Sequence, residues 1–329
     1  MTIFFSVVAG LMIGLVPQLL WLVCALVGRL MGHGMAYAPF GWVSVGLVAL
    51  AWIVMVYGFL VGRFQIETPQ EELCSKRVPK NFDGYRIVHI SDLHLSTFDD
   101  RPEALQRIVD SINAQQPDLI CFTGDLVTLG AEEAAPHTAA LQGLKARDGV
   151  VSVLGNHDFL IYNRQLLTSQ AREQAVEGLV AYERDSLGWK VLRNEHLTIE
   201  RGTDKLQVMG VDNKKGDSQG FATIDRGDLN KAQEGTLQEL FSLLLTHDPS
   251  HWSAEVWGKT IDLTLSGHTH AAQIRLGRWT PASWMFEQVD GRYDHGGQTL
   301  LVSAGIGCTL PMRIGCPSQI TTITLRARQ

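Results

Sequence analysis

Two long stretches without a charged side chain constrain this chain more than any other feature of its sequence. The first runs from Ile3 to Gly28 and is broken by Pro17 and Gln18, and the second runs from Phe40 to Val61. Each exceeds the roughly 20 residues that cross a hydrocarbon core about 30 Å thick. We therefore expect a transmembrane helical hairpin with a short turn near Gly32–Pro39.

A cleaved signal peptide is the alternative to a hairpin. It fits less well, because the chain start has no basic residue and the first apolar run is too long. A hairpin returns the chain to its starting side, and positive charges favour the cytoplasmic side. The connection carries Arg29, whereas the segment after the second stretch carries Arg63, Lys76, Arg77 and Lys80. We therefore expect the domain that follows to lie on the cytoplasmic side of the cell (inner) membrane.

The composition changes after the hairpin, which we place at residues 1–66. Residues 67–84 are polar, contain two prolines, and are typical of a linker. From residue 85 to residue 329 the pattern predicts an α/β domain with a helix over Pro102–Ala114. Short apolar runs in this part suit strands buried on both faces: Tyr85–Ile90, Leu119–Thr123, Val150–Leu154, Leu243–Thr246 and Leu263–Ser266. Stricter alternation over Lys205–Val211 and Ile320–Leu325 indicates further strands.

Each of the five short apolar runs ends in residues that can bind a metal. The groups are Asp92-Leu93-His94, Gly124-Asp125, Gly155-Asn156-His157-Asp158, Thr246-His247-Asp248 and Gly267-His268-Thr269-His270. A single histidine beside a strand is usually a hydrogen-bonded structural residue, and a single aspartate there is usually a turn or cap residue. Ligands of open α/β sheets gather at the carboxyl ends of the strands. The co-occurrence at five such ends therefore favours one metal site.

The spacing and the residue types indicate which metals such a site binds. Asp92 and His94 are two residues apart, so their side chains lie on the same side of an extended backbone, and His268 and His270 repeat this spacing. Imidazole and carboxylate ligands without thiolate suit Mn, Fe or Zn. A bridge between two such ions needs one carboxylate with both oxygens free, and Asp125 is the natural candidate.

The ordered set of motifs resembles the calcineurin-like metallophosphoesterase superfamily over roughly residues 85–329. The resemblance implies a sandwich of two mixed β-sheets flanked by helices. It also implies two divalent metal ions, which clamp a phosphate, generate a bridging hydroxide and stabilise in-line displacement. The first ion would be held by Asp92, His94, Asp125 and His270, and the second by Asp125, Asn156, His247 and His268. His157 would protonate the leaving-group oxygen, with Asp158 orienting its ring.

Within the superfamily, the chain resembles the bacterial YkuE-type branch, whose members often carry an N-terminal export signal or membrane helices. The resemblance rests on Gly-His-Thr-His followed by Gln273-Ile274-Arg275-Leu276, and on the later run Leu310–Pro317. The chain departs from the branch at Ala271-Ala272, where Gly-Gly is common.

Several substrates are compatible with these features. The hairpin suggests a phosphate ester or pyrophosphate linked to a lipid, as do aromatic residues near the site loops, which favour a membrane interface: Trp252, Trp257, Trp279, Trp284, Phe286 and Tyr293. Arg275, Arg278 and Arg313 could pair with a second phosphate. The alternatives are a tethered phosphodiesterase with a soluble substrate and a non-catalytic metal-binding scaffold. The net charge of −6 weighs against nucleic acid as a partner, and no sequence feature indicates an oligomeric state.

Overall fold

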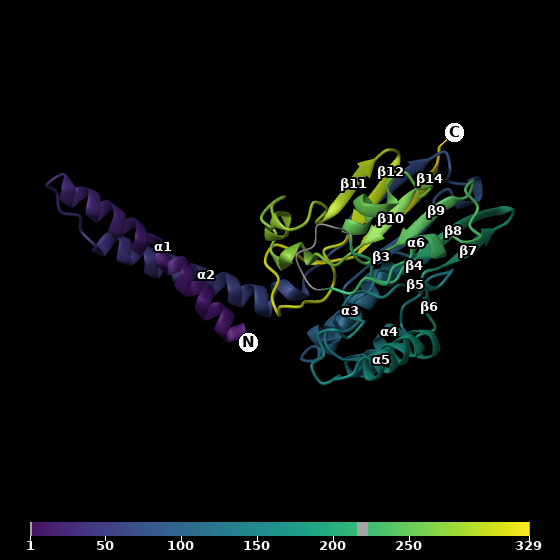
Figure 1. The fold of residues 1–329 in the computed structure, drawn as a ribbon, viewed down its shortest axis with the longest axis horizontal. Helices are drawn as coiled ribbons and strands as arrows, with labels where there is room; N and C mark the ends of the chain where they lie inside the picture. The colour runs from purple at the N-terminus through teal and green to yellow at the C-terminus, as the bar shows by residue number, and fades with distance from the viewer. Residues whose placement is uncertain (1, 216–222, 329) are drawn as a thin grey trace. The chain divides into compact units, whose positions relative to one another are not determined.

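Two long apolar helices, α1 (Thr2–Leu30) and α2 (Ala38–Leu60), form an antiparallel pair near the N-terminus (Figure 1). The computed structural model describes residues 2–215 and 223–328, which divide into two units. The helical pair and residues 310–314 make up the first unit. Both helices are long and apolar enough to cross a membrane, and residues 31–37 connect them, as the sequence predicts.

Small residues let the two helices approach closely. A Cβ atom on Gly14 would lie 2.9 Å from the side chain of Val48. The Ser44 hydroxyl donates a hydrogen bond to the Gly14 carbonyl oxygen at 2.7 Å. Small residues and buried hydroxyls of this kind are typical of helix contacts inside bilayers. The outward faces of the pair are lined by exposed large apolar side chains, as a lipid environment requires.

The second unit, which we call the catalytic unit, covers residues 64–309 and 315–328 of the described chain. It contains two six-stranded sheets (Figure 1). The first has the order β2-β14-β3-β4-β5-β6 and consists of β2 (Gln70–Ser75), β14 (Thr321–Ala327), β3 (Arg86–Ile90), β4 (Leu119–Phe122), β5 (Val150–Ser152) and β6 (Lys190–Val191). The second has the order β11-β12-β10-β9-β8-β7 and consists of β11 (Gly291–His295), β12 (Gln298–Val302), β10 (Leu263–Ser266), β9 (Phe241–Leu245), β8 (Asp204–Gly210) and β7 (Glu195–Arg201).

Helices and a small parallel pair of strands complete the catalytic unit. The pair joins β1 (Ile66–Glu67) to β13 (Ser318–Gln319). The α-helices are α3 (Pro102–Ala114), α4 (Thr138–Leu141), α5 (Ser169–Ala181) and α6 (Leu229–Ala232). Short 3₁₀ and π segments lie in the loops, including η8 (His270–Gln273) and η9 (Pro281–Trp284).

Alternating apolar side chains place the sheets in layers. Ile87 of β3 points into a core between the sheets that also contains Leu243 and Leu265. Val88, the next residue, packs on the opposite face in a core that includes Ile108 of α3. Each sheet is therefore buried on both faces, and the predicted sandwich of two mixed sheets flanked by helices is confirmed.

The predicted strands and helix are confirmed within a few residues, but the expected linker is not. Residues 67–84 include β2, which pairs in parallel with β14. Leu73 in this strand and Phe82 after it are buried. β2 lies at the edge of its sheet and buries few side chains, so it carries the polar residues of an edge strand and lacks an apolar run.

Candidate metal centre

Five loops converge where the carboxyl ends of the central strands of the two sheets meet. The first sheet contributes the residues after β3, β4 and β5, and the second contributes those after β9 and β10. These loops carry all the residues predicted as metal ligands: Asp92, His94, Asp125, Asn156, His247, His268 and His270. All seven are buried except His268, which is half-buried. Together they form a polar cluster inside the catalytic unit.

The first part of the cluster gathers around Asp92 and His94. His270 Nε2 lies 3.2 Å from Asp92 Oδ1. His94 Nε2 lies 3.1 Å from His270 Nε2 and 3.6 Å from Asp125 Oδ2. Four side chains from three separate loops therefore face one small volume.

The second part of the cluster shares Asp125 with the first. His247 Nε2 lies 3.2 Å from Asp125 Oδ2 and 3.1 Å from Asn156 Oδ1. His268 Nδ1 lies 2.8 Å from the same Asn156 oxygen. Asp125 Oδ2 faces both parts, whereas Asp125 Oδ1 accepts the backbone N–H of His157 at 2.8 Å. The expectation that both oxygens are free is therefore corrected, because one of them is held by the backbone.

The hydrogen bonds around Asn156 and His247 point toward a bound cation. The Asn156 amide Nδ2 donates to the Tyr162 hydroxyl at 3.0 Å, which turns Oδ1, an acceptor, toward His247. His247 Nδ1 lies 2.7 Å from the Thr123 carbonyl oxygen and donates to it, so Nε2 of the neutral ring is also an acceptor. Two acceptors 3.1 Å apart repel each other unless a proton or a cation lies beside both.

The electrostatics of the cluster agree with this geometry. Burial lowers the pKa of His247, but Asp125 and Asp92 outweigh burial and raise it to about 10. A proton therefore fills the place that a cation would take. Burial holds the pKa of His94 well below its usual range and also lowers the pKa of His268, so both rings are neutral donors of electron pairs. Neutral imidazole is the form that binds metals.

The distances within the cluster also fit a metal. Zinc lies about 2.0–2.2 Å from nitrogen and oxygen ligands, so neighbouring ligand atoms of one ion lie roughly 3.0–3.5 Å apart. The separations between neighbouring nitrogen and oxygen atoms of the cluster run from 2.8 to 3.6 Å. Further hydrogen bonds orient these atoms. The Thr123 carbonyl, for example, accepts the Nδ1–H of His247, and metal-bound histidines usually donate their other ring N–H in this way.

Unusual backbone angles coincide with the cluster. Asp92, His94, Asp125, His268 and His270 all have positive φ angles, between 39° and 72°. This region is uncommon for residues other than glycine. Strain of this kind is found at functional sites, where the surrounding structure holds the chain in place.

Two glycines allow the ligand loops to approach each other. A Cβ atom on Gly155 would lie 2.2 Å from Asp125 Oδ1 and 2.7 Å from His247 Cε1. One on Gly267 would lie 2.2 Å from Asp92 Oδ2. Any larger residue at these positions would displace predicted ligands, which explains the glycines in the motifs.

His157 lies beside the cluster, half-buried. One of its ring nitrogens lies within 4.8 Å of ligand atoms of His94 and Asp125. Its Nδ1 lies 2.6 Å from the Thr128 carbonyl oxygen and donates to it. This contact leaves Nε2 as the nitrogen available to a ligand.

The contacts of Asp158 differ from the expectation that it orients the ring of His157. Its carboxylate accepts backbone N–H groups from Gly155 at 2.9 Å, Asp125 at 2.7 Å and Leu126 at 2.8 Å. Asp158 therefore joins the loop after β4 to the loop after β5. The Thr128 carbonyl, in the loop after β4, is the group that accepts a hydrogen bond from the ring of His157.

Sequence reasoning missed Thr128 and Tyr162. The Thr128 hydroxyl lies 3.3 Å from His94 Nδ1, so this residue contacts both His94 and His157. The Tyr162 ring packs against the ring of His157 with centroids 4.5 Å apart, and its hydroxyl accepts the Asn156 amide. Neither residue lies in a strand-end motif, so only its position after folding identifies it.

The arginines proposed to bind a second phosphate have different environments. Arg275 forms ion pairs with Glu67 at 2.6 Å and Asp290 at 2.8 Å, which occupy its guanidinium. Arg313 is fully buried. Arg278 is exposed and has no ion pair with a described residue.

The aromatic residues expected near the site loops also lie in different environments. Trp252 is buried in the core on the outer face of the second sheet, and Tyr293 packs against that core. Trp257 stacks on His295 with centroids 4.0 Å apart, at the edge opposite the cluster. The ring of Phe286 lies 5.7 Å from that of His268, so this residue borders the cluster.

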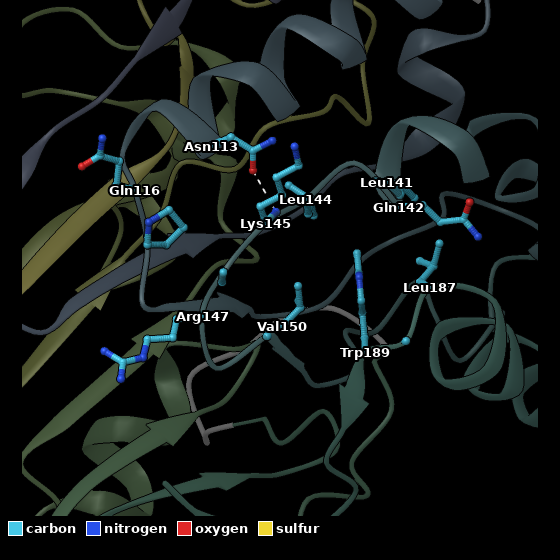
Figure 2. Close-up of a pocket in the computed structure, with 14 residues that line it drawn as sticks. Asn113, Gln116, Leu141, Gln142, Leu144, Lys145, Arg147, Val150, Leu187 and Trp189 are labelled. Carbon is cyan, nitrogen blue, oxygen red and sulfur yellow. Dashed lines mark hydrogen bonds between the residues drawn. The ribbon is translucent and has the colours of Figure 1, made fainter. Parts of the chain in front are cut away.

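A separate cavity of about 600 Å³ lies at the other edge of the first sheet, where β4 and β5 begin (Figure 2). Two of the side-chain amides that line it are hydrogen-bonded to neighbouring residues. The Asn113 side-chain oxygen accepts the Lys145 backbone N–H at 2.8 Å, and the Gln142 amide donates to the Ser186 carbonyl at 2.8 Å. None of the predicted site residues lines this cavity.

Comparisons with known proteins identify the family of the chain. The sequence model of the calcineurin-like phosphoesterase family matches residues 85–272. The chain is 31% identical to the uncharacterized metallophosphoesterase YkuE of Bacillus subtilis, over 80% of this chain and 86% of that protein. It is 29% identical to a transmembrane protein with metallophosphoesterase domain from Danio rerio, over 83% of this chain and 60% of that protein. A solved dimetal phosphatase from Danio rerio is 14% identical, with a TM-score of 0.39, over 70% of this chain and 90% of that one. The chain belongs to the calcineurin-like metallophosphoesterases, which are metal-dependent phosphoesterases.

Proposed function

We propose that this protein is a membrane-anchored phosphoesterase with two divalent metal ions, Mn, Fe or Zn, that hydrolyses a phosphate ester or pyrophosphate. The observation that carries the proposal is the meeting of buried ligand atoms from Asn156, His247 and His268 beside the shared Asp125. Buried atoms in such contact need a positive charge beside them, which is a proton on His247 when no metal is bound and a metal ion when one is.

The two parts of the cluster provide one ion site each. Asp92, His94, Asp125 and His270 would hold the first ion, and Asp125, Asn156, His247 and His268 the second. Two divalent ions supply Lewis acidity toward the phosphoryl oxygens and an activated water nucleophile. Asp125 Oδ2 lies close to His94 of the first site and His247 of the second, so this carboxylate would be shared by both sites.

The protein's own residues then position the phosphoester and transfer a proton. His157 keeps one proton on Nδ1, where it donates to the Thr128 carbonyl. In the imidazolium form its second proton is on Nε2, from which it can pass to the leaving oxygen as that bond breaks. The Tyr162 ring covers one side of His157 and restricts its rotation. Asp158 acts indirectly, because it holds the two loops that carry Asp125 and His157.

The test uses the purified full chain, a metal analysis and a panel of phosphomonoesters, phosphodiesters and pyrophosphates. We expect two metals per chain and a loss of roughly 10²–10⁴-fold in kcat for His157→Ala, with the metals retained. His196→Ala is the matched control, because His196 is also half-buried but lies on β7, away from the cluster. A His157→Ala variant as active as the wild type would contradict the assigned role. A wild type that binds metals but hydrolyses no phosphoester would favour the non-catalytic scaffold.

The proposed substrate is linked to a lipid, which the membrane helices support because they hold the catalytic unit beside a bilayer. A soluble phosphodiester is the alternative. We expect the full chain in mixed micelles to show a higher kcat/KM for a lipid phosphoester than for its water-soluble headgroup analogue. Equal values for the two would exclude the preference for lipids.

The proposed location is the cell (inner) membrane, with the catalytic unit in the cytoplasm. The positive charges after the second helix support this orientation. Cys74 is exposed in the catalytic unit, whereas Cys121, Cys308 and Cys316 are buried. We expect a membrane-impermeant thiol reagent to label Cys74 only after cells are permeabilised, with Cys74→Ser as the control. Labelling of intact cells would reverse the orientation.

A further inference from the structure

The loop from Leu276 to Met285 exposes several large apolar side chains close together. Trp284 is 79% exposed, Leu276 61%, Met285 43% and Trp279 42%. No other stretch of ten residues in the described catalytic unit exposes four large apolar side chains. Scattered exposed apolar residues are normal, whereas a group of them indicates an interaction surface.

The loop is built to hold these side chains outward. Leu276 and Trp279 exchange two backbone hydrogen bonds, at 2.8 and 3.2 Å, which close a tight turn with Gly277 and Arg278 at its tip. The Trp279 and Trp284 rings meet edge to face with centroids 5.5 Å apart. Trp284 thus packs on another exposed ring and contributes little to the core. The exposure is therefore a feature of an ordered loop.

The composition of the loop suits a bilayer surface. Tryptophan is enriched at the boundary between lipid tails and water. The run from Leu276 to Phe286 contains Arg278 and no acidic residue, so it is positive in a chain with a net charge of −6. An exposed arginine without a described ion pair is free to bind lipid phosphates.

The short connection to the apolar helices also favours a bilayer as the surface that this loop meets. The catalytic unit begins at Phe64, within a few residues of the end of α2 at Leu60. Helix α2 is long and apolar enough to span a membrane. A covalent link this short gives the catalytic unit a high effective concentration at the bilayer surface.

The loop lies next to the ligand loop that follows β10. The Thr280 hydroxyl donates to the carbonyl oxygen of Ala271, the residue after His270. Phe286, directly after the loop, lies against the ring of His268. A surface at this loop is therefore continuous with the ligand loop that follows β10.

We propose that the loop Leu276–Met285 inserts Trp279 and Trp284 into the interfacial layer of the bilayer that anchors the chain. Arg278 binds lipid phosphates at that surface. The loop would then guide the headgroup of a lipid-linked phosphoester to the metal cluster, and this last role rests on the proposed function.

The insertion is tested on the full chain in phosphatidylcholine vesicles, with and without anionic lipid, by quenching of tryptophan fluorescence with lipids brominated in their acyl chains. The difference in emission between the wild type and Trp279→Phe, or between the wild type and Trp284→Phe, gives the emission of that one tryptophan. The tryptophans in the membrane helices contribute equally to all variants and cancel in the difference. We expect brominated lipids to reduce this emission roughly twofold or more. Trp257→Phe is the matched control, since Trp257 is 41% exposed but lies at the opposite edge of the sheet, and its emission should not change. Quenching of Trp279 and Trp284 no stronger than that of Trp257 would overturn the proposal.

A second measurement separates the loop from the catalytic chemistry. We expect the double variant Trp279→Ser/Trp284→Ser to turn over a lipid phosphoester in vesicles roughly tenfold more slowly, with unchanged hydrolysis of a water-soluble phosphodiester. If the wild type hydrolyses neither ester, the proposed function fails, but the quenching still reports on insertion. Quenching with unchanged lipid turnover would refute the guiding role.

Discussion

The two edges of the sheets in the catalytic unit differ in how they use buried polar groups. At the carboxyl edge, buried ligand atoms such as Asn156 Oδ1 and His247 Nε2 crowd beside Asp125, and the backbone is held at positive φ. At the amino edge of the first sheet, a cavity of about 600 Å³ is lined by Asn113 and Gln142, whose side-chain amides hydrogen-bond within the protein. None of the residues predicted to bind a metal lines this cavity.

This difference shows where the fold accepts a cost in stability. Buried unpaired acceptors and strained backbone angles are unfavourable unless a ligand or the surrounding structure compensates for them. The carboxyl edge accumulates both, whereas at the amino edge Gln116 is strained but the side chains of Asn113 and Gln142 are hydrogen-bonded locally. The following variants test whether the two edges differ in function as they do in structure.

The largest expected effect is at the residue shared by both parts of the cluster. Asp125→Asn removes the negative charge between the two sites, so we expect loss of metal and a loss of activity on the order of 10³-fold or more. Lys145→Ala at the amino-edge cavity is the control and should leave both unchanged. Metal content and hydrolysis of a soluble phosphoester measure the outcome. An active, metal-loaded Asp125→Asn variant would show that the carboxyl edge does not depend on this charge for its function.

A smaller but still severe effect is expected from a single methyl group. Gly155→Ala places a Cβ atom 2.2 Å from Asp125 Oδ1, so the two loops must separate. A shift of about 1 Å in a catalytic group costs roughly 10²-fold in activity, and kcat on the same phosphoester measures it. Gly178→Ala on α5 is the control, because a Cβ atom there meets open space, and it should keep full activity. Wild-type kcat in Gly155→Ala would show that the loops tolerate separation.

The smallest effect concerns backbone strain at the two edges. Ala272 has φ 49° beside the ligand loop, and Gln116 has φ 51° at the amino edge. Glycine adopts these angles readily, so Ala272→Gly and Gln116→Gly should each stabilise the folded state by about 1 kcal/mol or less. Thermal unfolding of the two variants measures this. We expect only Ala272→Gly to lower metal retention, because it loosens the chain next to His270. Equal metal retention in both variants would mean that the strain plays no part in the site.

Much of the site could be predicted because its residues follow recognisable strands. The apolar runs before Asp92, Asp125 and Asn156 indicate buried strands, and parallel strands bring their carboxyl ends to one edge. The edge strand β2 could not be predicted in this way, since it buries few side chains. Tyr162 and Thr128 were also missed, because their contacts are formed by loops that have no periodic pattern.

Local sequence alone determined the two long apolar helices, the positions of the buried strands along the chain and the set of side chains proposed to bind metal. Apolar periodicity and strand-end motifs are properties of neighbouring residues. Only the tertiary structure decided which oxygen of Asp125 faces the other ligands, which group orients His157, and that Asp158 joins two loops. Those contacts depend on the angles of loops from different strands, and such angles are set by the packing of the whole sandwich.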